Sequence, residues 1–323
     1  MQFQGAAEPP VGIVFDADFG NNIDDALALA AFYGFQGKGE DRVIAVSTSR
    51  PGLDSAILAD ILVRFYTGAP GPFSTPPAIG LTLGKAAPDA PWVAAVVNKS
   101  AYPRDIVKVN DTADPLAVFR NALTAQFDVN AIVYLGGPAT NVAQAMDLPG
   151  VKELIAAKVR YLVTTLGNYA GGAADPRVLA DLPAARKVFA EWPSPIVAAG
   201  GELDAAVRFP GASIAKDFAW TADHPLVDAY RAASPMPYDA PAPALAAALY
   251  AVRPKQGYFK LSEPGTIAPG DDGRMKFTAA GGRHRYLIAD PAQHDRIQQV
   301  LVEAVSTKPV PRAPRFRPPQ KKQ

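Results

Sequence analysis

The chain has 323 residues, of which 49% are hydrophobic, so it is long enough to form one large α/β domain or two small ones with a sizeable core. The formal net charge is +1, which gives no global reason to expect a nucleic acid or a membrane as partner. Cysteine is absent, which excludes disulfides, cysteine-ligated zinc sites and a cysteine nucleophile.

Strands and helices are predicted to alternate over the first two hundred residues. The apolar run 11–15 indicates a buried strand, and residues 23–35 have helical spacing with Asp24 and Asp25 in the first turn, where the helix dipole favours carboxylates. The order then repeats, with strands at 43–48, 131–135, 159–164 and 195–199 and helices at 54–66, from about 140, and at 183–191. This alternation predicts a mainly parallel central sheet with helices on both faces, a Rossmann-like α/β core.

The pattern changes after about residue 205. A helix is predicted at 240–252, short strands between 257 and 288, and a last helix at 292–305. We expect one domain over 1–306, with a core at about 11–255 and a C-terminal helical and small β extension at about 256–306. Residues 307–323 are proline-rich and basic, which is typical of a disordered or draped tail; contact with an anionic partner is the alternative.

Four aspartates lie within ten residues where the first predicted strand meets the first helix: Asp16, Asp18, Asp24 and Asp25. Ligands of parallel α/β sheets gather at the carboxyl ends of the strands, and Gly136 also follows a predicted strand there. Carboxylates packed together without a cation would raise one another's pKa, whereas Ca²⁺ accepts about six to eight oxygen ligands. The cluster therefore predicts a calcium site. The alternative is that Asp24 and Asp25 only cap the helix while Asp16 and Asp18 face solvent.

The segment 16–26 (DADFGNNIDDA) resembles the N-terminal signature of the inosine-uridine preferring nucleoside hydrolases in its longer form, D-x-D-x-G-N-D-x-D-D-A, with Asn22 replacing one acid. Residues 137–141 (GPATN) are similar to the family's G-P-L-T-N turn, and 181–189 (DLPAARKVF) to its D-P-E-A-A-x-x-V-F helix. Tyr238-Asp239 with residues 244–254 resembles the C-terminal H-D-P-x-A segment in a divergent form with tyrosine. The resemblance implies a nucleoside hydrolase-like fold.

The resemblance also implies a ligand set for one Ca²⁺ per subunit. Asp18, Asp25 and Asp239 match the carboxylate ligands, and the backbone carbonyl of Gly136, or of Leu135, matches the main-chain ligand. Asp16 would order the loop from behind these ligands.

The implied reaction is hydrolysis of the N-glycosidic bond of a ribonucleoside or related N-riboside to ribose and free base, within purine or pyrimidine metabolism. Asp18 would be the general base that takes a proton from a metal-activated water. Asp24 would hold a ribose hydroxyl, and the surrounding carboxylates would stabilise the oxocarbenium-like transition state.

The chain departs from the family where the ribose and the leaving base would bind. Tyr238 replaces a histidine and is a poorer proton donor, so it would donate a hydrogen bond, stack on the base, or only pack over the site. The family's E-F-N falls on residues 175–177 (DPR): Asp175 could replace the acid, and Arg177 could clamp a phosphate or carboxylate or lie in solvent. Asn168 matches a ribose-binding asparagine.

The leading hypothesis is thus a Ca²⁺-dependent N-ribosyl hydrolase. The alternatives are a non-catalytic metal- and ribose-binding homologue and a hydrolase of a different N-riboside. A haloacid-dehalogenase-type phosphatase is disfavoured because Gly20 stands where that family has Thr or Val, and because the Asp24-Asp25 pair has no role in it.

The expected partner is a small-molecule nucleoside or N-riboside, with neither nucleic acid nor membrane involved. The family resemblance further implies a homo-oligomer, either a dimer or a tetramer. The compartment stays open: cytoplasmic, or periplasmic or secreted if a signal peptide has been removed. Residues 1–10 themselves lack the apolar stretch of such a peptide.

Overall fold

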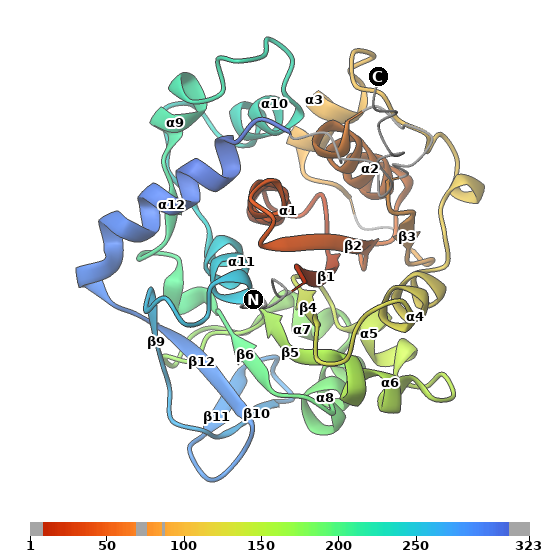
Figure 1. The fold of residues 1–323 in the computed structure, drawn as a ribbon, viewed down its shortest axis with the longest axis vertical. Helices are drawn as coiled ribbons and strands as arrows, with labels where there is room; N and C mark the ends of the chain where they lie inside the picture. The colour runs from red at the N-terminus through yellow and green to blue at the C-terminus, as the bar shows by residue number, and fades with distance from the viewer. Residues whose placement is uncertain (1–8, 69–75, 86–87, 310–323) are drawn as a thin grey trace, which may run out of the picture.

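A central sheet of eight strands runs through the molecule in the order β3-β2-β1-β4-β5-β6-β12-β9 (Figure 1). The computed structural model describes residues 9–68, 76–85 and 88–309. Neighbouring strands are parallel except β9, which pairs antiparallel with β12. The predicted mainly parallel α/β sheet is confirmed. The strands are β1 (Val11–Ala17), β2 (Asp41–Thr48), β3 (Ile79–Leu81), β4 (Ala131–Leu135), β5 (Val159–Thr164), β6 (Ile196–Ala198), β9 (Phe259–Leu261) and β12 (His284–Ala289).

Helices cover both faces of this sheet because alternate residues of a strand point to opposite sides. In β1, Ile13 and Phe15 belong to one apolar cluster and Val14 belongs to the other. The first cluster packs under α1 (Asp24–Gly37), α2 (Leu53–Thr67), α10 (Pro225–Ala233), α11 (Pro243–Val252) and α12 (His294–Ser306). The second packs under α4 (Pro115–Thr124), α5 (Thr140–Ala145), α6 (Val151–Lys158) and α8 (Leu182–Glu191).

The C-terminal part adds to the main sheet as well as to the helical layer. Strand β12 pairs with β6, so the sheet continues past the expected core, while β10 (Thr266–Pro269) and β11 (Met275–Thr278) form a separate hairpin. The helix predicted at 240–252 begins at Pro243, because residues 240–241 form β8, which pairs with β7 (Arg208–Phe209). Most of the predicted tail lies outside the described residues. Among those described, no helix combines the length and apolarity needed to cross a membrane.

Helix α1 holds Asp24 and Asp25 at its first turn and is itself fixed by packing on α11 and α12. Gly34 is buried where α1 meets α12, and a methyl group on it would collide with the backbone carbonyl of Ala304. The absence of a side chain at this position therefore sets how closely the two helices approach.

We expect Gly34→Ala to destabilise the protein by about 1–3 kcal/mol, because the added methyl group overpacks the crossing of α1 and α12. Gly37→Ala is the matched control: Gly37 is exposed at the end of the same helix, where alanine should be neutral or slightly stabilising. Urea denaturation of both variants measures the difference, and equal stabilities would contradict the packing argument.

Candidate functional site

All four aspartates of the N-terminal cluster are buried at the carboxyl edge of the sheet. Asp16 lies in β1, Asp18 follows it, and Asp24 and Asp25 open α1; their exposed fractions are 1, 5, 5 and 2%. The alternative in which Asp16 and Asp18 face solvent is therefore wrong. Burial of several carboxylates costs free energy, so hydrogen bonds or positive charge from neighbouring groups must offset that cost.

Asp16 joins three segments of the chain. Its Oδ2 accepts hydrogen bonds from Ser47 Oγ at 2.6 Å and from Asn141 Nδ2 at 2.7 Å, which link β1 to the end of β2 and to the first turn of α5. Burial raises the pKa of Asp16 to about 7, although the Ser47 and Asn141 hydrogen bonds oppose the rise. Its other oxygen, Oδ1, has no partner among the described residues.

Asp18 and Asp25 form a close pair. Burial and the charge of Asp25 raise the pKa of Asp18 well above its usual value. Asp25 Oδ1 accepts a hydrogen bond from the Tyr134 hydroxyl at 2.7 Å, and Asp18 Oδ2 accepts one from Asn21 at 2.9 Å. A side chain at Gly136 would collide with Asp25 Oδ1, so the turn after β4 can approach the pair only as glycine.

Asp175 and Arg177 form a buried ion pair beside the cluster. Asp175 caps α7 (Pro176–Ala180) by accepting from the Arg177 amide, and its carboxylate also accepts from Arg177 Nε and Nη2 at 3.0 and 2.8 Å and from the Gly167 amide at 2.7 Å. Burial alone would raise the pKa of Asp175, but the Arg177 guanidinium lowers it below its usual value. Arg177 does not lie in solvent: its side chain is 16% exposed.

A cavity of about 680 Å³ opens above these residues, which is a suitable size for a small-molecule ligand. Asp24 lines it, with an Oδ1 that has no partner among the described residues. Burial and the charge of Asp25 raise the pKa of Asp24 to about 8. Other residues predicted for substrate binding share this wall: Asn168, Asp175, Arg177 and Tyr238. Asp18 and Asp25 are not on the wall and lie within the buried cluster.

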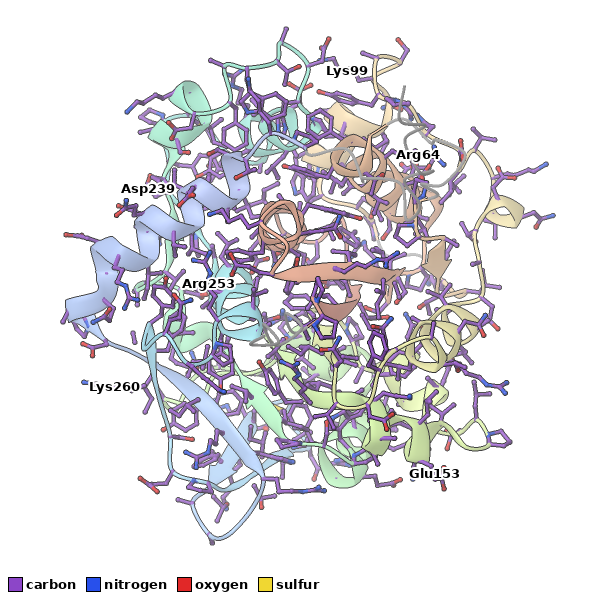
Figure 2. The ribbon with its side chains drawn as sticks, in the orientation of Figure 1. Arg64, Lys99, Glu153, Asp239, Arg253 and Lys260 are labelled. Carbon is purple, nitrogen blue, oxygen red and sulfur yellow. The ribbon has the colours of Figure 1, made fainter. Side chains whose placement is uncertain are left out.

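Tyr238 packs at the cavity wall, whereas Asp239 lies away from the aspartate cluster. The Tyr238 ring stacks on Tyr230 with centroids 4.4 Å apart, and its hydroxyl donates to the Tyr230 carbonyl at 2.8 Å. Burial raises the pKa of Tyr238, which disfavours proton donation. Asp239 is exposed at the periphery of the molecule and accepts from the Gly211 amide at 2.9 Å (Figure 2). The structure therefore does not bring Asp239 together with Asp18 and Asp25.

The predicted calcium ligand set is not assembled. Its third carboxylate, Asp239, is outside the site. Both candidate main-chain ligands accept hydrogen bonds: the Gly136 carbonyl from Arg177 Nη1 at 2.9 Å, and the Leu135 carbonyl from the Thr164 hydroxyl at 2.9 Å. Within the described part of the chain, no group of three or more His, Cys, Asp and Glu side chains is arranged to hold a metal ion. The unpartnered oxygens of Asp16, Asp18 and Asp24 still need donors, but these side chains do not form the expected cage.

Sequence reasoning missed several residues that complete the site. Thr165 follows β5, where its hydroxyl accepts from Arg177 at 2.8 Å, and its position after a buried strand could have identified it. Asp204 lines the cavity and raises the pKa of Asp24 through its charge. Nothing in the apolar run 131–135 indicates that the Tyr134 hydroxyl reaches Asp25.

We expect the wild-type protein to lose stability as the pH rises, because Asp16 is buried, and we expect Asp16→Asn to abolish that loss. Because the pKa of Asp16 is about 7 in the folded protein and near 3.8 when unfolded, its stabilising contribution is present at low pH and is lost as the pH rises through 7. Asparagine keeps an acceptor for Ser47 and Asn141. Relative to the wild type, the variant should gain roughly 2–3 kcal/mol of unfolding free energy between about pH 5 and pH 8.

Chemical denaturation of both proteins at the two pH values measures this gain. A difference between Asp16→Asn and the wild type that does not change with pH would show that Asp16 has an ordinary pKa.

The fold was compared with known proteins. No protein-family model and no curated protein sequence matches this chain. Solved structures do match: an inosine-uridine preferring nucleoside hydrolase from Bacillus anthracis (16% identity, TM-score 0.69, covering 92% of this chain and 100% of that one) and a plant nucleoside hydrolase (17%, 0.67, 92% and 99%). A purine-preferring ribonucleoside hydrolase from Gardnerella vaginalis also matches (14%, 0.66, 91% and 98%). The chain therefore has the fold of the nucleoside hydrolases over nearly its whole described length.

Proposed function

We propose that this protein hydrolyses the N-glycosidic bond of a ribonucleoside or a related N-riboside, releasing ribose and the free base. The observation that carries the proposal is Asp24, which lines a cavity of about 680 Å³ and whose buried Oδ1 has no partner among the described residues, in a chain with the nucleoside hydrolase fold. A buried carboxylate oxygen without a donor is an acceptor that a ribose hydroxyl can satisfy. The similar structures are named for inosine, uridine, guanosine or purine nucleosides, which makes these the first substrates to test.

Asp18 is the proposed general base that takes a proton from the attacking water; it lies behind Asn21, which lines the cavity and donates to Asp18 Oδ2 at 2.9 Å. Its Oδ1 is buried without a partner, and its raised pKa makes it a stronger proton acceptor than an ordinary aspartate once it is ionised. Asp24 is proposed to bind a ribose hydroxyl, and the negative charge of both side chains would stabilise the positive charge that develops on the ribose ring. Asn168 and Trp92, on the same cavity wall, would contact the substrate further out.

A binding protein without turnover is the second candidate. It is favoured by one observation: the Tyr238 hydroxyl is committed to the Tyr230 carbonyl, so it is not free to protonate a leaving base. Asp204 is a further carboxyl group on the cavity wall that could supply this proton instead, since burial raises its pKa. Ribose release separates the two candidates, because a binding protein would be stabilised by ribose without producing any.

We expect Asp18→Asn and Asp24→Asn to fail in different ways when ribose release is measured from inosine, guanosine, uridine, adenosine, cytidine and nicotinamide riboside. Loss of the base should lower kcat by about 100-fold or more. Loss of the charged acceptor for the ribose should raise KM on the order of 10- to 100-fold.

Asp114→Asn is the matched control, because Asp114 caps α4 at the surface and lies outside the site. It should leave kcat and KM unchanged. Full activity of Asp18→Asn would contradict the proposed base, and no ribose from any of the six compounds would favour the binding protein.

A further inference from the structure

Arg177 has no hydrogen-bond donor left for a ligand. A guanidinium carries five N–H groups, and here Nε donates to Asp175 Oδ1, Nη1 to the Gly136 carbonyl and Thr165 Oγ1, and Nη2 to the Thr165 carbonyl and Asp175 Oδ2. All five distances lie between 2.8 and 3.0 Å. The expectation that Arg177 clamps a phosphate or carboxylate of the substrate is therefore not supported, since all five N–H groups of the guanidinium already donate to the protein.

The Arg177 guanidinium is hydrogen-bonded to the backbone carbonyl that the predicted metal ion would use as a ligand. The Gly136 oxygen receives Arg177 Nη1 at 2.9 Å and the Thr165 hydroxyl at 3.4 Å, which engages both of its lone pairs. A calcium ion would need to approach the same oxygen to about 2.3–2.6 Å. Arg177 would have to be displaced first, at the cost of breaking a buried ion pair with Asp175.

The charge of Arg177 acts on the whole aspartate cluster. It lowers the pKa values of Asp18, Asp24 and Asp25, against the stronger effect of burial. A fixed positive charge thus lies next to the carboxylates in the way that a bound cation would.

The remaining carboxylate that a divalent ion would require is missing. In the H-D-P-x-A pattern the aspartate directly precedes the proline, and the proline that begins α11 is Pro243. The residue before it is Ala242, which is fully buried and has no side-chain oxygen, while Asp239 lies outside the site. The sequence match to Tyr238-Asp239 was therefore out of register with the helix that the pattern introduces.

We propose that the Arg177 guanidinium is the permanent cation of this site, and that the site binds ribose and acts without a divalent metal. The inference rests on the proposed function only where turnover is measured, because metal binding and thermal stability are read independently of it. Arg177 is a positioning residue in this account: it holds the Gly136 turn and the Asp175 carboxylate in place, and it offsets the negative charge around the substrate.

Calorimetric titration of the wild-type protein with calcium chloride, and separately with magnesium chloride, tests the inference directly. We expect no saturable binding of either ion, and the same Tm in EDTA as in millimolar Ca²⁺. Saturable binding of one Ca²⁺ per chain, or a Tm that falls in EDTA, would overturn the inference. If ribose is released, its rate should be unchanged by EDTA; if no ribose is released, the proposed function fails while the titration still decides this inference.

Arg177→Gln and Arg177→Lys add a second measurement. Glutamine removes the positive charge, whereas lysine keeps the charge and loses the planar set of five N–H donors. If charge is the contribution of Arg177, the Tm of Arg177→Gln should lie well below that of Arg177→Lys at neutral pH. Equal Tm values for the two variants at neutral pH would contradict the role of Arg177 as the cation. If neither variant folds, the titration of the wild-type protein decides alone.

Discussion

Burial of several carboxylates at one strand-to-helix junction is the constraint on which the rest of this site depends. Asp16, Asp18, Asp24 and Asp25 are almost inaccessible to water, and burial raises the pKa of each one. Each carboxylate requires hydrogen-bond donors, positive charge or a proton to remain there. The protein supplies donors from side chains of β2, α5 and β4, and it supplies positive charge from Arg177 at the start of α7.

The parallel sheet makes this arrangement possible. Strands β1, β2, β4 and β5 lie side by side and end at the same edge, so segments separated by more than a hundred residues deliver their polar groups to one place. Gly136 lets the turn after β4 approach Asp25, and the packing of α1 on α11 and α12 fixes the turn that carries Asp24. The cavity is therefore built on rigid elements on the aspartate side, and on the loops after β5 and β6 on the other.

Much of the fold could be predicted from the sequence because it follows from local patterns. Buried strands such as β1 and β4 are unbroken apolar runs, and their alternation with helices indicates a parallel sheet before any contact is known. Short elements were missed: β3 has three residues, too few for a periodic signal. The attachment of β12 to β6 was also missed, because strand pairing between remote segments leaves no local pattern.

The aspartate cluster of the site could be predicted from the sequence, whereas the role of Arg177 as its positive charge could not. Asp16, Asp18, Asp24 and Asp25 are neighbours in sequence, so their clustering is a local fact. Whether a distant residue joins them depends on register and side-chain direction: a shift of a few residues before α11 excludes Asp239 and leaves Ala242 at the start of the helix.

Arg177 illustrates the same limit. Its position in the sequence indicates a loop residue near the substrate, but only the folded chain shows its five bonds to the protein and its charge beside the carboxylates.

A crystal structure determined in the presence of ribose and millimolar calcium chloride tests the central claim most directly. The account predicts a ribose hydroxyl bound to Asp24, with Arg177 Nη1 still donating to the Gly136 carbonyl and no ion between Asp18 and Asp25. A calcium ion bound by Asp18, Asp25 and the Gly136 carbonyl, with Arg177 displaced from that oxygen, would contradict it.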